Sequence, residues 1–469
     1  MSFTSFDFFV FFVCVWCVQR VLPHRPRNLF LLAASYFFYG CWNWKLLSLI
    51  LLSTCVDYTA SHRIAATDDE AARRRWLTFS CVVNLSVLAF FKYANFGIES
   101  AESLLTSLGV TTTDWRLDIL LPAGISFYTF QTMSYTIDVY RRDLKPLDNF
   151  FDYALYLSFF PQLVAGPIER GTHLAPQMTG KHVANWHDIQ YGAWLCVKGI
   201  FKKAVIADNL APLVDGVFNS TSPQCGTAVL LALYAFAFQI YGDFSGYSDI
   251  ARGTAKMLGY DIMLNFRLPY FAQSPSEFWQ RWHISLSSWL RDYLYIPLGG
   301  NRRGTFFTYR NLLLTMLLGG LWHGAAWNFV IWGAWHGLLL IGQRLLSGGK
   351  PESSGSSAWA VWSRRIAMFH LVCIGWLFFR ANTLPQSLQF LQALGSSWTW
   401  NTELAMMAWQ IGFLCGPLLL IQWLQESSKD LNVVLHMSLM PRTAVITVVL
   451  FMILTLGSFG GREFIYFQF

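Results

Sequence analysis

Apolar residues in this chain are gathered in long runs separated by short polar connections. Runs of about twenty apolar residues recur along nearly the whole length, as helices need in order to cross a hydrocarbon core about 30 Å thick. The pattern predicts an all-α integral membrane protein with roughly eleven transmembrane helices. The predicted spans lie near residues 6–18, 28–41, 44–60, 76–91, 119–139, 226–241, 307–321, 326–345, 366–380, 404–423 and 441–459.

Two stretches depart from this pattern. The segment from Phe150 to Pro167 is apolar but contains Pro161 and Gly166, so we expect a broken or re-entrant helix there. The stretch 347–357 holds three glycines, five serines and a proline, which is typical of a flexible loop rather than a linker between domains. We therefore expect residues 1–469 to form a single polytopic membrane domain.

Composition supports the membrane assignment. Hydrophobic residues make up 54% of the chain and charged residues only 13%, against roughly a quarter charged in an average soluble domain. Such a chain cannot cover a water-soluble surface. Phe, Trp and Tyr account for 17%, and rings such as Tyr39, Trp42 and Trp44 stand at the ends of apolar runs, where they favour the headgroup layer.

The net charge of +7 comes from short basic clusters in the connections. This is the distribution of the positive-inside rule, and it does not indicate nucleic-acid binding. Placing Arg20, Arg25 and Arg27 in the cytoplasm gives an alternating topology with the loop 92–118 outside. In that topology, later cytoplasmic connections hold Arg63, the run 73–75, Arg141, Arg142 and Lys145, and the pair Lys202 and Lys203.

Ionisable residues at membrane depth are expensive and mark a cavity or a pathway. The region from Gln239 to His336 concentrates them among Trp and Gly. Its segment RWHISLSSWLRDY at 281–293 is amphipathic at helical spacing, and it predicts either an interfacial helix or a solvated cytoplasmic helix. The ionisable residues are Asp243, Asp249, Arg252, Arg267, Glu277, Arg281, His283, Arg291, Asp292, His323 and His336.

His323 is the better candidate for chemistry, because apolar runs precede and follow it and place its imidazole within the membrane profile. A neutral imidazole can accept a hydroxyl proton near physiological pH, as O-acyl transfer requires. Gly319, Gly320 and Gly324 would leave room for a substrate beside it. The alternative is a core histidine satisfied by one hydrogen bond.

The other histidines do not complete a metal site. His336 lies thirteen residues after His323, about 220° around a continuous helix, so the two rings would not share a face unless the helix breaks. For His336 we expect a structural role or a role in supporting the site. The histidines lack the i, i+4 spacing of a helical zinc site. Cys14 and Cys17 form a CxxC inside an apolar run with no evident partner. We therefore expect no metal and no tightly bound cofactor.

Five blocks carry the distinctive motifs of the chain. They are PAGISFYTFQTMSYTIDVYR at 122–141, FFPQLVAGPIER at 159–170, YGDFSGYSDIARG at 241–253, FWQRWHISLSSWLRDYLYIPLGGNR at 278–302 and GGLWHGAAWNFVIWGAWHG at 319–337. Together and in this order they resemble the membrane-bound O-acyltransferase (MBOAT) family, in particular the bacterial branch that includes alginate O-acetyltransferases. Residues 122–337 are thus the predicted motif-bearing catalytic core.

The resemblance implies a helical fold with re-entrant or interfacial helices around a central tunnel. It places the functional histidine of the family on His323 and the histidine of the RWH motif on His283. In the family, acyl-CoA reaches the catalytic histidine from the cytoplasm, and an acceptor reaches it from the other side. We therefore expect acetyl-CoA as the donor substrate, with Arg281, Trp282 and Arg291 near its binding site.

The last residues, REFIYFQF at 462–469, resemble the carboxy-terminal aromatic motif of systems in which a terminal tyrosine carries the acyl group. A phenyl ester is more activated than an alkyl ester, so a tyrosine retains transfer potential after the acyl group leaves the thioester. Tyr466 is thus a candidate relay nucleophile. The alternative is an aromatic interface anchor.

The resulting prediction is an acetyltransferase of a bacterial cytoplasmic (inner) membrane that moves acetyl from cytoplasmic acetyl-CoA toward an extracytoplasmic polysaccharide such as alginate. His323 is the expected general base, and an extracytoplasmic polysaccharide acetyltransferase is the expected partner protein. Near alternatives are D-alanyl transfer to teichoic acid and acetyl transfer to peptidoglycan. The alternative from another class is a transporter or export channel, whose intramembrane His, Asp and Arg would form a proton relay.

Overall fold

The computed structural model describes residues 1–469 except 164–165, 181–182, 348–356, 460–461 and 468–469. Every regular element in this described part is helical, and no strand occurs in it, which confirms the predicted all-α class. The loop predicted over 347–357 falls almost entirely on 348–356 and so lies outside the described residues.

Six helical segments among the described residues are long and apolar enough to cross a membrane, by length and composition. A protein with several such helices agrees with the predicted membrane embedding, whereas the count of roughly eleven spans is not confirmed. The six segments are Glu70–Ser107, Gly226–Met257, Trp327–Ser347, Ala358–Arg380, Thr402–Ser428 and Leu439–Leu456.

The chain divides into two compact units. The first comprises Met1–Trp194 and Ala251–Met263, and the second comprises Leu195–Ile250 and Leu264–Phe469. The predicted motif-bearing core over 122–337 therefore has residues in both units. That core and the single membrane domain over 1–469 stay predictions.

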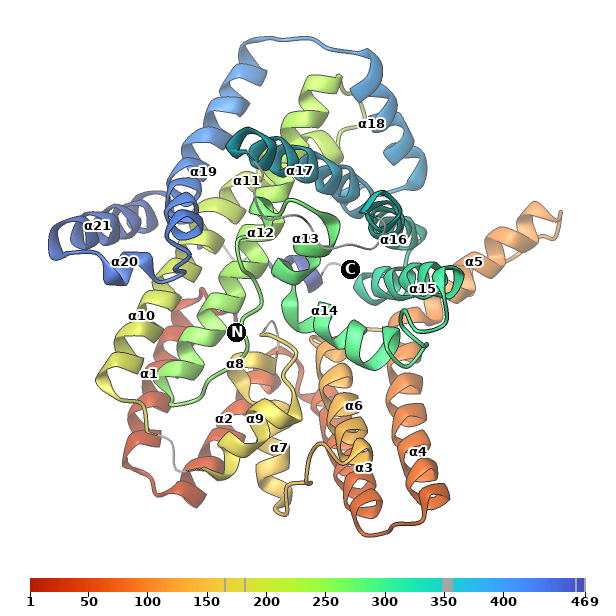
Figure 1. The fold of residues 1–469 in the computed structure, drawn as a ribbon, viewed down its shortest axis with the longest axis vertical. Coiled ribbons are helices and arrows are strands. Elements are labelled where there is room, and N and C mark those ends of the chain that lie inside the picture. The colour runs from red at the N-terminus through yellow and green to blue at the C-terminus, as the bar shows by residue number, and fades with distance from the viewer. Residues whose placement is uncertain (164–165, 181–182, 348–356, 460–461, 468–469) are drawn as a thin grey trace. The chain divides into compact units, whose positions relative to one another are not determined.

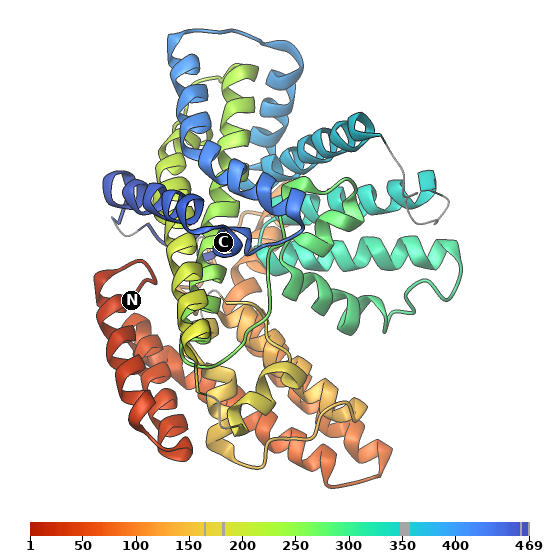
Figure 2. The ribbon, with the colours of Figure 1, turned by 60° about the vertical axis from the view of Figure 1, so that its left-hand side comes forward.

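In the first unit, α3, α4 and α6 lie side by side, as do α1 and α2 (Figures 1 and 2). Side-chain caps fix two helix starts, because Asp69 accepts from the Ala71 N–H and Asn149 accepts from the Phe151 N–H. The helices are α1 (Phe6–Val21), α2 (His24–Asn43), η1 (Trp44–Leu46), α3 (Leu47–Ala65), α4 (Glu70–Leu88), η2 (Ala89–Tyr93), α5 (Ala94–Ser107), α6 (Ile125–Arg141), α7 (Phe150–Ser158), α8 (Phe160–Leu163) and α9 (Gly171–Thr179).

A buried carboxylate ties three helices of this unit together. Asp57 of α3 has none of its surface exposed. It accepts hydrogen bonds from Asn84 at 2.8 Å and from Thr132 and Thr136 at 2.7 and 3.1 Å, and also from Ser80. Because an unsatisfied buried carboxylate is costly, these donors from α4 and α6 favour one arrangement of the bundle.

The second unit contains the longest helix, α12, and the hairpin of α15 and α16. Helices α10 and α12 extend from this unit into residues of the first. The elements are α10 (Trp186–Ile200), η3 (Phe201–Ala207), α11 (Asp208–Phe218), α12 (Gly226–Met257), η4 (Pro269–Phe271), α13 (Pro275–Arg281), α14 (Ile284–Leu290), η5 (Arg291–Tyr295), α15 (Thr305–His323), α16 (Trp327–Ser347), α17 (Ala358–Arg380), α18 (Leu384–Ser396), α19 (Thr402–Ser428), α20 (Val433–His436), α21 (Leu439–Leu456) and η6 (Ile465–Phe467).

Of two breaks predicted in the first unit, the helix end near residue 91 is wrong and the broken helix over 150–167 is observed. The helix expected to end near residue 91 continues through a π-helical turn, η2, into α5. Lys92 lies inside that turn, and its ammonium donates to Ser126 at 3.5 Å. The broken helix expected over 150–167 is confirmed, since α7 ends at Ser158 and α8 begins at Phe160.

The sequence placed the basic pair Lys202 and Lys203 in a cytoplasmic connection. The structure contradicts this prediction. Both lysines are buried in the π-helical segment η3. Lys202 pairs with Asp249 at 2.7 Å, and Lys203 pairs with Asp208 and Asp243 at 2.8 and 2.6 Å. Because their charge is neutralised inside the protein, these lysines do not mark a side of the membrane.

Candidate active site

His323 lies at the carboxy-terminal end of α15, where the chain turns back. It is the last residue of that helix, and Gly324 follows with an extended backbone before α16 begins at Trp327. Only 3% of His323 is exposed. The helix therefore breaks between His323 and His336, so the angle calculated for a continuous helix does not apply.

Glycines bring α15 and α16 into backbone contact. A Cβ atom on Gly320 would lie 2.1 Å from the Phe329 carbonyl oxygen, and one on Gly333 would lie 2.3 Å from the Met316 carbonyl oxygen. No side chain fits at those distances, so these positions require glycine for the helices to lie side by side (Figure 1).

The three glycines expected to leave room for a substrate, Gly319, Gly320 and Gly324, have different surroundings. The space at Gly320 is filled by α16, and a Cβ on Gly324 would lie 2.1 Å from the Phe329 ring. Gly319 differs, because a Cβ on it would meet only the flexible Leu290 side chain, at 3.1 Å, and because it lines a cavity. Two of the three glycines thus serve packing, and one borders open space.

The three rings predicted to carry the chemistry lie together in the second unit. The ring centroids of His323 and Tyr466 are 5.5 Å apart, and His283 lies 6.3 Å from His323 and 6.4 Å from Tyr466. Trp332 and Phe379 pack against His323 at 4.8 and 5.6 Å. Residues that are far apart in the sequence therefore form one aromatic cluster around two imidazoles.

His283 is oriented by a network that starts from Asn265. The segment predicted as one amphipathic helix breaks here, because His283 adopts a left-handed backbone (φ 44°) between α13 and α14. The Asn265 amide oxygen accepts from the Ser285 N–H at 3.3 Å and hydroxyl at 3.0 Å, and it lies 3.1 Å from His283 Nδ1. Since that oxygen accepts, Nδ1 donates, and Nε2 is left as the proton-accepting nitrogen.

Tyr466 is brought to His323 by the carboxy-terminal segment, which is tied at two points. The Arg462 guanidinium pairs with Asp215 at 3.0 Å. The Ile465 N–H donates to Asp243 Oδ2 at 2.7 Å in a buried hydrogen bond. Both ties precede Tyr466, which is itself only 9% exposed.

An apolar cavity of about 210 Å³ has His323 in its wall. Its other walls come from α13, α14, η5, α15 and α16. Such a cavity suits a thin, mostly uncharged chain rather than a charged group. The lining residues are Trp279, Leu286, Ser287, Leu290, Arg291, Tyr295, Leu312, Thr315, Met316, Gly319, His323, Trp332 and Leu340.

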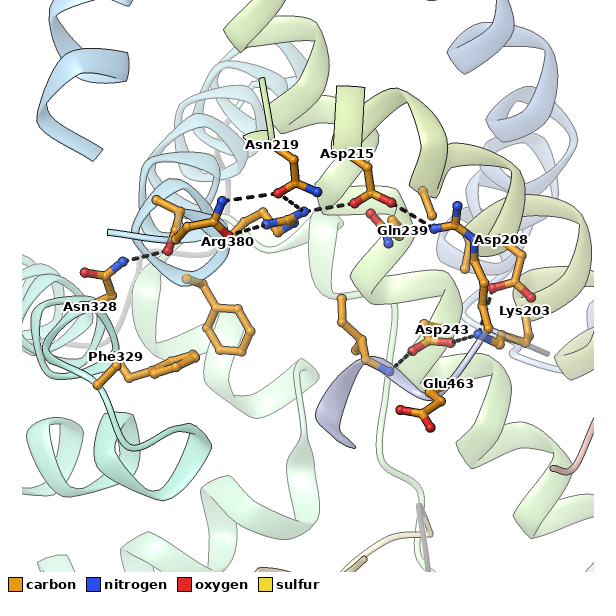
Figure 3. A pocket seen from close by; sticks show the side chains of 18 of the residues that line it. Lys203, Asp208, Asp215, Asn219, Gln239, Asp243, Asn328, Phe329, Arg380 and Glu463 are labelled. Carbon is orange, nitrogen blue, oxygen red and sulfur yellow. Dashed lines mark hydrogen bonds and ion pairs between the residues drawn. The ribbon is translucent and has the colours of Figure 1, made fainter. Parts of the chain in front are cut away.

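A larger, polar cavity of about 720 Å³ borders the carboxy-terminal segment. Figure 3 shows the polar side chains of this cavity. Asp215 forms an ion pair with Arg380 at 2.9 Å and a second one with Arg462. Asp243 pairs with Lys203 and accepts a hydrogen bond from the backbone of the carboxy-terminal segment. The cavity is lined by Lys203, Ala207, Asp208, Ala211, Asp215, Asn219, Gln239, Asp243, Ala325, Ala326, Asn328, Phe329, Phe379, Arg380, Ala381, Asn382, Arg462, Glu463 and Ile465. Phe379 and Ile465, the neighbour of Tyr466, thus link this cavity to the ring cluster.

Comparison with known proteins decides the family. A sequence model of the membrane-bound O-acyltransferase family matches residues 37–351. The chain belongs to the MBOAT family.

Three MBOAT relatives illustrate how far the similarity extends. The protein named probable alginate O-acetylase of Azotobacter vinelandii is 46% identical over 407 residues, covering 86% of this chain and 79% of the relative. That of Pseudomonas aeruginosa is 45% identical over 426 residues, covering 90% and 80%. The peptidoglycan O-acetyltransferase of Helicobacter pylori is 37% identical over 402 residues, covering 79% and 74%.

The MBOAT assignment makes the chain a multi-pass membrane acyltransferase, as predicted, and it sets aside the transporter alternative. The relatives support O-acetylation of a polysaccharide. Among the described residues, no group of three or more His, Cys, Asp or Glu side chains could hold a metal ion.

The residues predicted near the acyl-CoA site of this MBOAT chain have different environments. Arg291 lines the apolar cavity, with its side chain 64% exposed and paired with Asp292 at 2.7 Å. Arg281 forms ion pairs with Glu277 at 2.6 Å and Glu426 at 2.9 Å. Trp282 is fully buried. Only Arg291 therefore faces the cavity beside His323, while a role in acyl-CoA binding stays a prediction for all three.

His336 of the last MBOAT block is fully buried beside the site. Its ring stacks on Phe278 at 6.0 Å and packs on Trp279 and Trp332 at 5.1 and 4.9 Å. Trp332 also contacts His323, so His336 supports the ring cluster through one shared indole. This environment is consistent with the structural role predicted for it.

The glutamate of the GPIER block holds a loop of the first unit. Glu169 is buried, and it accepts hydrogen bonds from the Met263 N–H and from His173. On its other side, His173 lies 3.7 Å from Asp261. Its contacts with Asp261 and Glu169 raise the pKa of His173 to about 10, so the imidazole is a cation in the folded protein.

Sequence reasoning missed Asn265, Lys203 and Phe379 as parts of the site. Asn265 stands in the polar region between two motif blocks, but an amide carries no signal of its own without a structure. Lys203 was interpreted as part of a cytoplasmic charge pair, and no motif singles out Phe379. The pairing of Lys203 with two carboxylates could have been suspected only from its apolar neighbours.

Proposed function

We propose that this MBOAT protein is an acetyltransferase of a bacterial cytoplasmic membrane. It takes acetyl from cytoplasmic acetyl-CoA and passes it across the membrane for O-acetylation of an extracytoplasmic polysaccharide such as alginate. One observation carries the proposal: His323 stands in the wall of an apolar cavity and packs on Tyr466, which is held beside a polar cavity. The relatives named as alginate O-acetylases support the choice of polymer.

The donor side of the reaction is the apolar cavity. Its volume of about 210 Å³ suits the acetyl thioester and the uncharged arm behind it, while the nucleotide stays outside. Arg291, whose exposed guanidinium borders the cavity, is placed to attract a phosphate of coenzyme A. Acetyl-CoA is a substrate in this scheme and not a resident cofactor.

The chemistry needs one base, which is His323. Its imidazole accepts the proton of the attacking hydroxyl, the hydroxyl oxygen bonds to the thioester carbonyl carbon, and the carbon–sulfur bond breaks. The imidazolium then returns the proton to the departing sulfur. Coenzyme A leaves as a thiol, and the neutral imidazole is regenerated. His283, whose Nε2 atom is a proton acceptor, lies close enough to His323 and Tyr466 to polarise the reacting groups.

The attacking hydroxyl in the first step is that of Tyr466. Acetyl-tyrosine is an activated ester, so an acceptor hydroxyl arriving through the polar cavity displaces the tyrosine in a second step, and the tyrosine oxygen recovers a proton. That acceptor belongs to an extracytoplasmic polysaccharide acetyltransferase, which finally esterifies the polymer. Acetyl crosses the membrane in this scheme, and coenzyme A does not.

A second acceptor is favoured by one comparison. The peptidoglycan O-acetyltransferase of Helicobacter pylori is 37% identical over most of this chain, so peptidoglycan is the alternative polymer. Supplying each polymer to the same membranes and measuring ester-linked acetyl on each separates the two acceptors.

Replacement of the base tests the proposal. In membranes given labelled acetyl-CoA, His323→Ala should lower acetyl transfer by at least about a hundredfold, because a general base contributes that much or more. The control is His370→Ala, which removes a histidine of α17 that hydrogen-bonds Tyr234 and should keep its activity. Wild-type acetylation by His323→Ala at equal membrane expression would refute the base assignment.

A further inference from the structure

The carboxy-terminal tail, residues 462–466, is aligned by one buried carboxylate. Asp243 of α12 has a side chain that is 4% exposed, and its Oδ2 accepts from the Ile465 N–H at 2.7 Å. A charge-assisted hydrogen bond to a backbone N–H fixes the position of the chain more firmly than a neutral one. The residue after Ile465 is Tyr466, so this bond sets where the tyrosine ring stands.

Lys203 holds that carboxylate in place. Its ammonium lies 2.6 Å from Asp243 Oδ1 and 2.8 Å from Asp208 Oδ1, with only 2% of its side chain exposed. A buried carboxylate without a cation would lose its charge or its position. The ammonium uses one oxygen of Asp243 and leaves the other oriented toward the tail, as Figure 3 shows.

Aromatic packing extends the alignment toward His323. Phe464 packs on Tyr247 at 4.7 Å, and the Tyr466 ring packs on Phe244 at 4.5 Å. Phe244 directly follows Asp243 on α12, so the same helical turn both ties the tail backbone and supports the tyrosine ring. With this support, the Tyr466 ring lies 5.5 Å from His323.

We propose that Asp243, paired with Lys203, is a positioning residue that seats the carboxy-terminal tail so that the Tyr466 hydroxyl meets His323. This inference rests on the proposed function in one respect, namely that Tyr466 is the acetyl carrier. How firmly Asp243 holds the tail in this position can be measured without any acetyl transfer, and we refer to this below as seating.

The chain offers a matched control on the same two elements. Asp249 lies six residues after Asp243 on α12, and it pairs with Lys202 of η3 at 2.7 Å. Asp249 also pairs with Lys198 at 3.3 Å. Asp249→Ala removes the same kind of buried carboxylate beside the same lysine-bearing segment and leaves the hydrogen bond between Asp243 and Ile465 in place. Any general loss of stability is thus common to both variants.

The first experiment measures seating by proteolysis of the full chain in detergent. Trypsin cleaves after Arg462, and the loss of residues 463–469 is read from the intact mass. Asp243→Ala should be cleaved about tenfold to a hundredfold faster than wild type, because opening the tail no longer breaks the hydrogen bond of Ile465. Asp249→Ala should be cleaved at the wild-type rate. Asp243→Asn retains an oxygen acceptor and should fall between.

The second experiment measures acetyl-Tyr466 formed from labelled acetyl-CoA. Asp243→Ala should lower kcat by about tenfold to a hundredfold at an unchanged KM for acetyl-CoA, since donor binding does not involve the tail. Asp243→Asn should restore part of the rate. Wild-type cleavage and wild-type kcat in Asp243→Ala, or equal losses in Asp249→Ala, would overturn the positioning role. If Tyr466 of the wild type never gains acetyl but the differences in cleavage rate are observed, Tyr466 is not the acetyl carrier. The role of Asp243 in positioning the tail is then still supported.

Discussion

At the scale of single residues, the site depends on contacts between side chains that are far apart in the sequence. His283, His323 and Tyr466 are each recognisable in the sequence, the histidines by their motifs and the tyrosine by the terminal aromatic motif. Their packing within about 6.5 Å is visible only in the structure. The partner that orients His283, Asn265, was not predicted, because its role follows from the left-handed backbone at His283 and not from any spacing.

Tyr466→Phe is the residue-scale prediction. The substitution keeps the ring against His323 and Phe244 but removes the nucleophilic oxygen, so transfer to the polymer should fall by at least about a hundredfold. Labelled acetyl on the polymer is the measurement, with binding of acetyl-CoA expected to stay normal.

A matched control for this substitution is Tyr270→Phe, which removes a hydroxyl that donates to the Ala237 carbonyl in the same unit and should retain transfer. Normal turnover in Tyr466→Phe would leave this tyrosine as a packing residue only.

At the scale of elements, the sequence located most helices but misplaced several breaks. The predicted spans near 226–241 and 307–321 fall within α12 and α15, and the span near 326–345 begins one residue before α16. The amphipathic segment 281–293 is not one helix, because the network from Asn265 holds His283 at φ 44° and interrupts it. Helical periodicity within the segment does not indicate that break, because the break depends on Asn265, which lies outside the segment.

The hairpin of α15 and α16 gives the element-scale prediction. Gly333→Ala would place a Cβ 2.3 Å from the Met316 carbonyl oxygen, so the helices must separate, at a cost of about 1–3 kcal/mol. The melting temperature in detergent should fall. Gly342→Ala, on the same helix with nothing within 4 Å of the added atom, should melt at or slightly above the wild-type temperature. Equal melting of the two variants would contradict the packing role of Gly333.

At the scale of the whole molecule, membrane embedding followed from composition and long apolar runs, and the family followed from the ordered motif blocks. The number of spans did not follow, because several predicted segments do not meet the length and hydropathy expected of a crossing helix. Topology from charge was also incomplete. Lys202 and Lys203 are neutralised in buried ion pairs, which no single sequence distinguishes from a cytoplasmic cluster.

Stability as a function of pH is the whole-molecule prediction. The pKa of His173 is raised to about 10 by Asp261 and Glu169, while an unfolded histidine titrates near 6.5. The His173 imidazolium therefore stabilises the folded state fully below pH 6.5, and this stabilisation is lost as the pH rises toward 10. The melting-temperature difference between wild type and His173→Gln should be largest near pH 6 and should shrink by pH 10.

His187→Gln, at an exposed position of α10, is the control for the pH series. Its melting-temperature difference from wild type should stay small throughout. A His173→Gln difference that grows with pH would contradict the assigned cation.

Helix α15 ends on the residue proposed as the base, and that ending has an electrical consequence. The last carbonyls of a helix together carry a partial negative charge equivalent to about half an electron, and His323 stands among them as the final residue. In the proposed reaction, the proton that His323 accepts therefore arrives at the end of the helix where the partial charge is negative. Unlike a carboxylate, the peptide dipoles do not titrate, so this partial charge persists at every pH at which the helix stays folded.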